Sequence, residues 1–360
     1  MWSEWRWAEG DYTRSVGPAR NPGMAVFFLS LNRNKRSVTL DLKQPAALAA
    51  MARLIGGADV FVHSMRAGAM QRLGLDYESL RLSNPRLIYA SAGGYRQGSS
   101  RAGWPAYDDI IQAASGIAAM NAAADGAPRY LPNVLCDKLT GIVLASSVGM
   151  ALYHREKSGK GQEVHVAMME TMVGFNLLEH LWGGVLDDPS LGFGYTRLTT
   201  PHRKPYAASD GHLAVLAITN DQWRRLFVCL DRPELVNDAR FAELTPRTQN
   251  IDALYAIVAE AMQGQSVAEW RRRFDAADIP NGEVNGFSDL WNDPYLHETG
   301  FFQRMEHPTE GPIVTMQPPA RFSGSPAGVD ILPARQGEHT AAVLGEIGLT
   351  PDQIAAVSAG

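Results

Sequence analysis

The first 170 residues alternate between short apolar runs and segments with helical spacing of apolar positions. Strand-like runs cover residues 37–42, 58–62 and 87–91, and helix-like segments cover residues 44–54, 67–73 and 77–82. Gly56, Gly57 and Gly74 mark where helices end. Strands that alternate with helices over short connections predict an α/β domain with a parallel sheet, whereas the first thirty residues predict irregular structure.

The strongest helical pattern of the chain runs over residues 137–157. It stops at residues 158–161, Ser-Gly-Lys-Gly, a glycine-containing segment typical of a helix end. A strand over 163–167 and a helix over 168–182 follow, after a weaker helix over 110–120 earlier in the chain. These elements extend the predicted α/β domain.

The pattern changes near residue 183. Residues 183–194 are rich in glycine, aspartate and proline, which is typical of a linker. Beyond it, the sequence predicts a hairpin over 206–217 that turns at Asp210-Gly211, and helices over 221–230 and 267–277. This part predicts a second, smaller domain, and helices over 337–347 and 351–357 close the chain.

Composition narrows the class of protein. The chain has 360 residues, 45% of them hydrophobic and 20% charged, with a net charge of −5. This charge gives no electrostatic reason to expect nucleic acid or an anionic membrane as a partner. The two cysteines, Cys136 and Cys229, lack zinc-ligand spacing, and no metal site is predicted. No apolar run predicts a membrane span or signal peptide, so we expect a cytoplasmic protein.

Asp137 stands just ahead of the strongest helical pattern. An aspartate in this place commonly caps the helix, because its carboxylate accepts hydrogen bonds from unpaired backbone amides. The same place can also orient a reactive carboxylate and stabilise negative charge nearby. Spacing favours the cap over catalysis and cannot exclude either.

Other residues suggest chemistry only weakly. Three cations in residues 32–36, Asn-Arg-Asn-Lys-Arg, can bind phosphates or form a solvated loop. Ser64, Met65 and Arg66 follow a predicted strand, where ligands collect in α/β sheets, and Arg72 can reach the same crevice or lie on the surface.

Three further groups have simpler explanations. Cys136 adjoins an anion, which raises a thiol pKa, so a buried structural cysteine is the better interpretation. His165 has no partner nearby in the sequence and is interpreted as a core or surface histidine. Tyr107, Asp108 and Asp109 can face a substrate or merely start a helix.

Together these segments resemble one family. The stretch NRNKRSVTLDLK at 32–43, ADVFV at 58–62, LGLDY at 73–77, SAGGY at 91–95, SGKGQ at 158–162 and GEHT at 337–340 are similar to class III CoA-transferases. That family includes formyl-CoA:oxalate and carnitine CoA-transferases, with α-methylacyl-CoA racemase as a relative. The resemblance covers nearly the whole chain.

The resemblance implies a fold and an assembly. A large Rossmann-like domain is expected over residues 1–185 and 320–360, a linker over 186–205, and a smaller α+β domain over 206–319. The chain would thus return to the large domain, and two chains would interlock as a homodimer. Family members usually begin with a strand–helix–strand element ahead of Met1, so a truncated start is expected here.

The resemblance also implies the chemistry. Asp137 is expected to attack an acyl-CoA thioester, forming an aspartyl anhydride and then an aspartyl-CoA thioester that passes CoA to a carboxylic acid. Coenzyme A and acyl-CoA enter as substrates, with no tightly bound cofactor. The matching CoA-contact positions are Arg6, Leu40, Asp41, Leu42, Lys43, Ser64, Met65, Arg66, Arg72, Tyr107 and Asp108.

Two rival functions remain at this stage. A racemase relative would need a histidine in the Ser115-Gly116 stretch, and alanines stand there instead, so a two-base mechanism lacks one base. A truncated, non-catalytic CoA-binding protein is the other rival. The glycine-rich loop of some oxalate-type transferases is not recognisable, which argues against oxalate as the substrate. Residues 197–206 and the second domain are expected to shape the acyl pocket.

Overall fold

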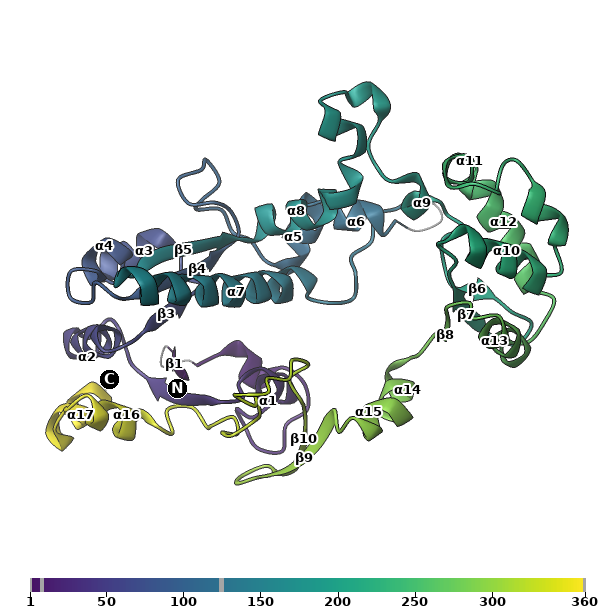
Figure 1. Ribbon diagram of the computed structural model, residues 1–360. Coiled ribbons are helices and arrows are strands. Elements are labelled where there is room, and N and C mark those ends of the chain that lie inside the picture. The colour runs from purple at the N-terminus through teal and green to yellow at the C-terminus, as the bar shows by residue number, and fades with distance from the viewer. Residues whose placement is uncertain (1, 7–9, 123–125, 359–360) are drawn as a thin grey trace. The chain divides into compact units, whose positions relative to one another are not determined.

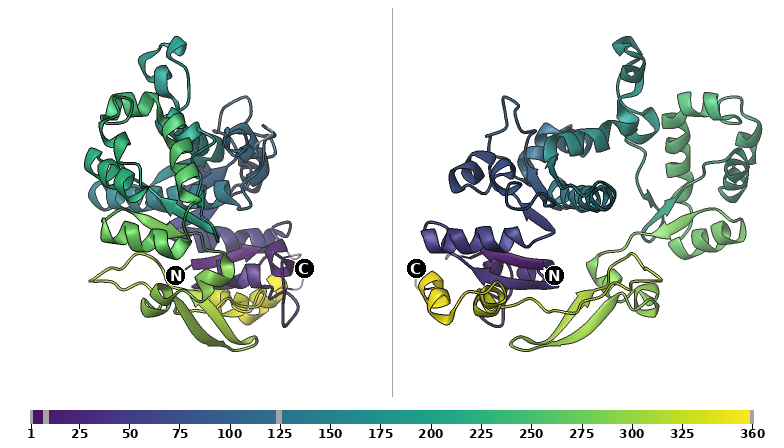
Figure 2. Two further views of the ribbon diagram at one scale, coloured as in Figure 1. Left: turned by 90° about the vertical axis from the view of Figure 1, so that its right-hand side faces the viewer. Right: turned by 60° about the vertical axis from the view of Figure 1, so that its left-hand side comes forward.

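A computed structural model describes residues 2–6, 10–122 and 126–358, without the side chains of 2–6, 189 and 358. The chain divides into two compact units. The first unit contains Met1–Ala106, Asp137–Met168 and Trp291–Gly360, and the second contains Tyr107–Cys136 and Met169–Leu290. The path of the chain through the elements can be followed in Figure 1 and, from two further directions, in Figure 2.

A three-stranded parallel sheet lies in the first unit, with the order β3-β4-β5. Its strands are β3 (Val60–His63), β4 (Ile88–Gly93) and β5 (Gln162–Ala167). On one face Leu144 and Val148 of α7 (Leu135–Ser158) pack against Ala90 and Val166. The opposite face packs against residues of α2 (Pro45–Gly56), α3 (Ala67–Leu73) and α4 (Tyr77–Leu80). The predicted α/β organisation with a parallel sheet is confirmed.

Helix α7 is the longest of the described helices, with 24 residues. It is also the described helix whose length and apolar composition would suffice to cross a membrane. Its buried residues Leu144, Val148 and Ala151 face the protein core, as in a core helix of an α/β domain. The helix ends at Gly159, whose φ of 73° is the left-handed conformation that glycine adopts at low cost.

The N-terminal and C-terminal parts of the chain meet in the first unit. Strand β1 (Trp2–Arg6) pairs in parallel with β2 (Lys35–Thr39). The Ser37 amide donates to His339 Nδ1 (3.2 Å), and the Thr39 amide donates to Thr340 Oγ1 (3.0 Å). Helices α16 (Thr340–Glu346) and α17 (Pro351–Ser358) follow, and Val343 joins the core beside β2.

The region predicted to be irregular near the N-terminus contains regular elements. Besides β1, it forms η1 (Tyr12–Ser15) and α1 (Val26–Leu31). Arg14 is buried here, with its guanidinium 3.7 Å from the ring centre of Phe28 and bonded to the carbonyl of Ala334. Because these partners lie as far as 320 residues away in the sequence, local spacing could not indicate this order.

A hairpin near the C-terminus also belongs to the first unit. Strands β9 (Phe302–His307) and β10 (Gly311–Met316) pair antiparallel, after the short helix α15 (Pro294–Glu298). Asn21 donates to Glu310, and Arg33 donates to Thr315 Oγ1 at 2.9 Å. These contacts explain why the hairpin joins the first unit, whereas the predicted small domain extended to residue 319.

The second unit begins with helices that the predicted bounds placed in the large domain. Residues 107–136 and 169–185 group with this unit, and the side chain of Asn176 donates to the carbonyl of Ser115 at 2.8 Å. The elements are α5 (Asp108–Ala114), α6 (Ile117–Met120), α8 (Met168–His180), η2 (Trp182–Leu186), η3 (Pro189–Leu191) and α9 (Thr196–Thr199).

The remainder of the second unit is α+β, with a three-stranded antiparallel sheet of order β6-β7-β8. Its strands are β6 (Tyr206–Ala207), β7 (His212–Val215) and β8 (Asn281–Glu283). The helices are α10 (Asn220–Cys229), η4 (Pro233–Asn237), α11 (Leu244–Gln249), α12 (Ile251–Met262), α13 (Val267–Ala276) and α14 (Phe287–Trp291). Their buried faces form one core that includes Trp223, Phe227, Phe241, Trp270 and Phe274.

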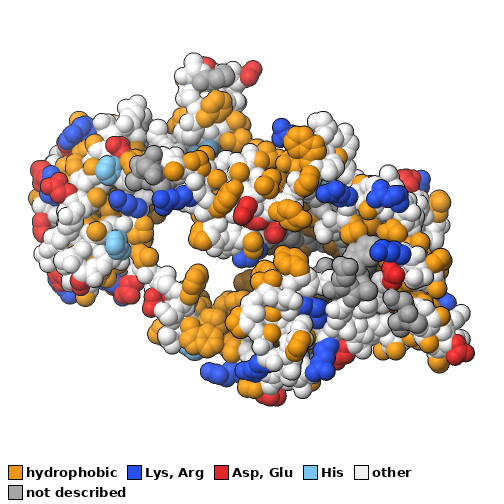
Figure 3. Space-filling model, turned by 180° about the vertical axis from the view of Figure 1, so that it is seen from behind, with side chains coloured by type: hydrophobic (Ala, Val, Ile, Leu, Met, Phe, Trp, Pro, Cys, Tyr) orange, Lys and Arg blue, Asp and Glu red, His pale blue; other side chains and the backbone are white. Residues whose placement is uncertain are grey.

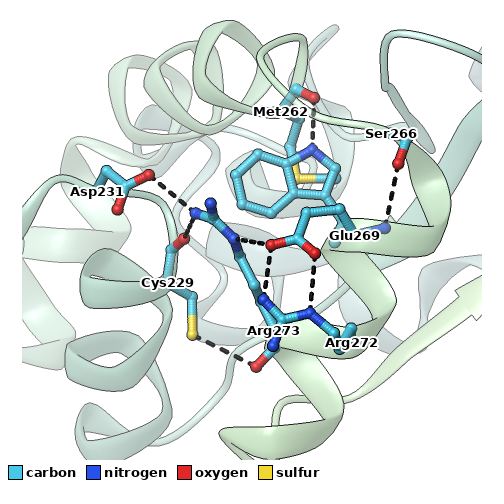
Figure 4. A network of polar contacts seen from close by, with 8 residues as sticks. Cys229, Asp231, Met262, Ser266, Glu269, Arg272 and Arg273 are labelled. Carbon is cyan, nitrogen blue, oxygen red and sulfur yellow. Dashed lines mark hydrogen bonds and ion pairs between the residues drawn. The ribbon is translucent and has the colours of Figure 1, made fainter.

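Polar contacts around α13 hold this core together (Figure 4). The indole of Trp270 donates to the carbonyl of Met262 at 2.7 Å, so the buried ring leaves no polar atom unpaired. Glu269 accepts hydrogen bonds from Arg272 and Arg273, and Arg273 also binds Asp231 beyond the end of α10. The helix is thereby tied to its neighbour at its surface as well as in the core.

Candidate active site

Asp137 lies in the first turn of α7, and its side chain is exposed. The helix begins at Leu135, so Asp137 does not occupy the capping position ahead of the helix. The backbone amide of Cys136 instead donates to Oδ1 of Asp108 at 2.7 Å. Another carboxylate therefore binds an amide of this first turn, a helix-capping role that was one of the two interpretations of Asp137. Cys136 itself is fully buried, as expected of a structural cysteine.

Asp108 is buried, only 5% exposed, at the start of α5. Its second carboxylate oxygen accepts a hydrogen bond of 2.6 Å from Nε2 of Gln112. Both oxygens are thus engaged within the protein, although the family resemblance implied a CoA contact for this residue. Tyr107, immediately before it, is 76% exposed and presents its side chain to solvent.

Residues 40–43 follow β2, and their side chains alternate between core and surface. Leu40 and Leu42 are buried in the core of the first unit, and Lys43 is exposed. Oδ1 of Asp41 accepts from the Lys43 amide at 3.1 Å, which holds the turn into α2. In this segment only the backbone, Asp41 and Lys43 present groups that a ligand could contact.

Residues 64–66 follow β3 at the carboxyl edge of the sheet, the edge at which ligands bind in open α/β sheets. Ser64 and Arg66 are exposed, and Met65 is partly buried against the core. Arg72 is exposed on α3. The structure therefore places one arginine and a hydroxyl just beyond this strand end, and a second arginine in the last turn of the helix that follows.

His63 fixes the loop that contains these residues. Its Nδ1 accepts the Met65 amide at 3.1 Å, and its ring packs between Phe61 and Tyr89. Nε2 of His63 has no hydrogen-bond partner among the described residues. Burial lowers the pKa of His63 to about 4, because the charged imidazolium would lose its hydration. At neutral pH the ring is therefore uncharged.

A polar row crosses the sheet at the register of His63. Ser91 lies opposite His63 on β4, and His165 lies opposite Ser91 on β5. Oγ of Ser91 is 2.9 Å from Nδ1 of His165, whose Nε2 lies 3.3 Å from the carbonyl of Tyr95. Donation from Nε2 to that carbonyl leaves Nδ1 as the acceptor of the Ser91 hydroxyl. His165 thus has partners that its own sequence neighbourhood did not reveal.

The cations of residues 33–36 are engaged within the first unit. Arg33 binds Thr315, Lys35 donates to Asn32 at 2.8 Å, and Arg36 forms a bidentate ion pair with Glu346 at 2.7 and 2.9 Å. A solvated loop therefore does not describe them, and phosphate binding by these cations stays a prediction. The contacts of Arg33 and Arg36 hold β10 and α16 to the region around β2.

Two other predictions concern Arg6 and the question of a metal site. Arg6 ends β1 opposite Thr39, and its side chain lies outside the described residues. Among the described side chains, no group of three or more histidines, cysteines, aspartates and glutamates could hold a metal ion.

A cavity of about 390 Å³ lies in the first unit. It is lined by residues of α1, of β10 and of the segments before and after α1, among them Arg20, Val26, Leu29, Arg33 and Val314. None of the CoA-contact positions implied by the family resemblance lines it. The candidate site is therefore defined by Asp137 and the strand ends, without support from this cavity.

Comparison with known proteins decides the family. A family profile described as CoA-transferase family III matches residues 6–340. The chain belongs to CoA-transferase family III. It is an enzyme of that family with CoA-transferase activity, for which the family implies acyl-CoA and carboxylate substrates.

Three relatives are 28% to 33% identical in sequence to this chain. The chain is 32% identical over 343 residues to the probable fatty acyl-CoA transferase Rv3272 of Mycobacterium tuberculosis, covering 92% of this chain and 86% of that protein. It is 33% identical over 293 residues to acetyl-CoA:oxalate CoA-transferase of Acetobacter aceti, covering 79% and 73%. Human succinyl-CoA:glutarate CoA-transferase is 28% identical, covering 94% and 77%.

Solved structures support the same assignment. The crystal structure of Rv3272 from Mycobacterium tuberculosis superposes with a TM-score of 0.81 at 29% identity, covering 95% of this chain and 90% of that chain. A CAIB/BAIF family protein from Brucella suis gives 0.76 at 28% identity, covering 96% and 91%. The resemblance inferred from the sequence is thereby confirmed for family, enzyme class and fold.

Proposed function

We propose that this CoA-transferase moves coenzyme A from an acyl-CoA donor to a small carboxylic acid, with Asp137 as the covalent nucleophile. The observation that supports this role is an exposed carboxylate in the first turn of α7. The Cys136 amide beside it is already bound by Asp108. Asp137 therefore stands inside the first turn and does not bind that amide.

The proposed reaction proceeds through two kinds of covalent intermediate. A carboxylate oxygen of Asp137 attacks the thioester carbonyl carbon, and the C–S bond breaks with its electron pair leaving on the CoA thiolate. The product is a mixed anhydride. The thiolate then attacks the aspartyl carbonyl of the anhydride, which releases the donor acid as a carboxylate and leaves an aspartyl-CoA thioester.

The second half repeats these steps with the acceptor. The acceptor carboxylate attacks the aspartyl thioester and expels the thiolate, and the thiolate attacks the acceptor's acyl carbon in the new anhydride. Asp137 returns to a carboxylate, and the acceptor leaves as its CoA thioester. No oxidant, reductant or net proton transfer is required, which agrees with a site proposed to use no tightly bound cofactor.

Exposed polar groups near the ends of β2 and β3 suit the nucleotide and pantetheine of CoA. Guanidinium and ammonium groups pair with phosphates, and backbone amides near strand ends can bind the same anions. We assign this role to Arg6, Lys43, Ser64, Arg66, Arg72 and the backbone of residues 40–42 and 65. The family resemblance also implies a substrate contact for Tyr107, whose exposed phenol is available as a hydrogen-bond donor.

The decisive experiment combines kinetics with intact-protein mass spectrometry. Purified enzyme is incubated with succinyl-CoA or acetyl-CoA and a panel of mono- and dicarboxylic acids. CoA exchange is expected to fall by at least about 10³-fold in Asp137→Ala. A covalent CoA adduct, released by hydroxylamine, is expected on the parent enzyme and absent from that variant.

Cys136→Ser is the matched control, because it changes the adjacent side chain and leaves the carboxylate. It is expected to keep most activity. Exchange that survives Asp137→Ala would reject the proposed nucleophile. Deuterium incorporation at the α-carbon without exchange would instead identify a racemase, and CoA binding without either reaction would identify an inactive binding protein.

We also propose a homodimer. The residues that support it are large apolar side chains exposed on and after α8: Phe175, Leu178, Trp182, Leu186, Leu191 and Phe193. Hydrophobic side chains are visible among charged ones on the face seen in Figure 3. Exposed apolar clusters commonly mark protein interfaces. Analytical ultracentrifugation tests this: a monomer at micromolar concentration would contradict it.

A further inference from the structure

We propose that Gln112, acting through Asp108, is a positioning residue for the nucleophile. The proposal rests on the assigned role of Asp137 and adds a buried polar relay that supports the helix turn on which Asp137 stands. It also gives Asp108 a different part from the CoA contact that the family resemblance implied.

The relay starts at a fully buried amide. Gln112, in α5, is 0% exposed and makes contacts in three directions. Its Nε2 donates to Oδ2 of Asp108 at 2.6 Å and to the carbonyl of Asn133 at 3.0 Å. Its Oε1 accepts the amide of Leu131 at 2.9 Å. One side chain therefore holds both a carboxylate and the loop that leads into α7.

The relay ends one residue before the nucleophile. Asp108 Oδ1 accepts the Cys136 amide at 2.7 Å, and Asp137 is the next residue of the helix. A carboxylate at a helix N-terminus is favoured by the partial positive charge there. With that amide occupied, the carboxylate of Asp137 is not needed to cap it.

The buried amide also fixes which way Asp108 points. A carboxylate that accepts one hydrogen bond on each oxygen has little freedom to rotate, because turning would leave a buried donor unpaired. Gln112 supplies the donor on the oxygen opposite Cys136. Removing it is expected to loosen both Asp108 and the loop at 131–133, and thus the first turn of α7.

Positioning and CoA binding by Asp108 make opposite kinetic predictions. If the relay positions the nucleophile, Asp108→Ala lowers kcat by roughly 10²-fold, the loss expected from misplacing a reacting group by about 1 Å. KM for the acyl-CoA donor then stays within about threefold. If Asp108 binds CoA directly, KM rises and kcat changes little.

Gln112→Leu keeps the volume of the side chain and removes its hydrogen bonds. It is expected to lower kcat in the same direction as Asp108→Ala, with KM for the acyl-CoA donor nearly unchanged. Asp108→Asn retains an oxygen for the Cys136 amide but turns a donor toward Gln112. Because Nε2 of Gln112 is itself a donor, Asp108→Asn is expected to lower kcat in the same direction.

The controls separate the relay from general damage. Asp109→Ala changes the exposed neighbour of Asp108 and is expected to retain parental kcat and KM. Circular dichroism and thermal unfolding identify variants that fail to fold, and Asp108→Asn is used if Asp108→Ala does so. The time course of the covalent CoA adduct gives a second readout, which is expected to slow in step with kcat.

Unchanged kcat in both folded Asp108→Asn and Gln112→Leu would overturn the relay, and so would a rise in KM alone. Asp137→Ala is measured in parallel. Activity that persists in Asp137→Ala rejects the nucleophile itself, whereas loss there together with full activity in the relay variants rejects only the positioning role.

Discussion

Two regions of the molecule differ in the residues they contain: the carboxyl edge of the β3–β5 sheet and the helical core of the second unit. The sheet edge contains a row of polar residues, His63, Ser91 and His165, of which the first two are buried, and Nε2 of His63 has no partner among the described residues. The helical core buries aromatic rings, and the Trp270 indole is paired with a carbonyl at 2.7 Å.

The two regions differ in how far their buried polar groups are paired. A buried polar group without a partner costs roughly 1–3 kcal/mol, whereas packed aromatic rings contribute several kcal/mol each. Polar groups at the sheet edge border the segments proposed to bind CoA. The aromatic core has no such segments and serves to hold the second unit together.

The largest expected effect tests the aromatic core. Trp270→Ala removes a side chain that is 1% exposed and is expected to destabilise the protein by about 3–5 kcal/mol. Trp270→Phe is expected to cost less, because it keeps most of the ring contacts and loses the hydrogen bond to Met262. Urea unfolding followed by circular dichroism measures both. Trp104→Ala, at a site 55% exposed, is the control. An equal loss of unfolding free energy in this variant would mean that burial of Trp270 is not what stabilises the core.

The next effect tests the sheet edge through pH. The pKa of His63 is lowered from an ordinary value of 6.5 to about 4. Between these two pH values the unfolded chain binds a proton at this histidine and the folded protein does not. Stability is therefore full above pH 6.5 and falls as the pH drops toward about 4, by at most about 3 kcal/mol.

The test is to measure the free energy of unfolding of the parent and of His63→Phe across that pH range. The variant is expected to lose this part of the pH dependence, whatever its stability at pH 7. His212→Phe changes an exposed histidine of the second unit and serves as the control. If the free energy of unfolding falls equally steeply with pH in the parent and in His63→Phe between pH 6.5 and 4, burial of His63 does not govern the loss of stability in acid.

Local patterns predicted the sheet well, because its signals lie within each strand. Residues 58–62, 87–91 and 163–167 correspond to β3, β4 and β5 within one or two residues. Short apolar runs closed by glycine or asparagine-proline carry this information without help from distant parts of the chain.

Long-range partners could not be predicted in the same way. Arg36 pairs with Glu346, 310 residues away, and the Cys136 amide binds Asp108, 28 residues away. Nothing in the spacing of either residue indicates its partner, so the spacing left open phosphate binding or a solvated loop for the cations, and capping or catalysis for Asp137. Gln112 was missed for the same reason: an isolated glutamine in a helix gives no sign that it is fully buried.

A smaller effect is expected at the start of α10 in the second unit. Thr219 Oγ1 accepts the Gln222 amide at 3.1 Å, and the Gln222 side chain accepts the Thr219 amide at 3.1 Å. Thr219→Ala removes half of this reciprocal cap and is expected to cost about 1 kcal/mol in unfolding free energy. Thr219→Ser keeps the oxygen and is the control, so an equal loss in both would point to the methyl group instead.

The smallest effect is expected at the ion pairs of α13 (Figure 4). Hydrogen bonds from Arg272 and Arg273 lower the pKa of Glu269 to about 2. A lowered carboxyl pKa stabilises the fold above its ordinary value of about 4.5, and that contribution is lost as the pH falls through about 2. Because the Glu269 side chain is 29% exposed and its partners lie at the surface, solvent and salt screen much of this contribution.

Glu269→Gln should therefore lower the midpoint of thermal unfolding slightly at pH 7, and the difference from the parent should shrink as the pH falls below about 4.5. Added salt should reduce the same difference, because it screens surface charges. The stability lost in Trp270→Ala, which comes from burial of a ring, should not depend on salt in this way. The direction of the pH trend does not separate the two regions, because protonation of Glu269 and of His63 both weaken the fold as the pH falls. The separating observation is salt: a His63 effect as salt-sensitive as that of Glu269 would mean that the histidine is governed by surface charge and not by its buried place at the sheet edge.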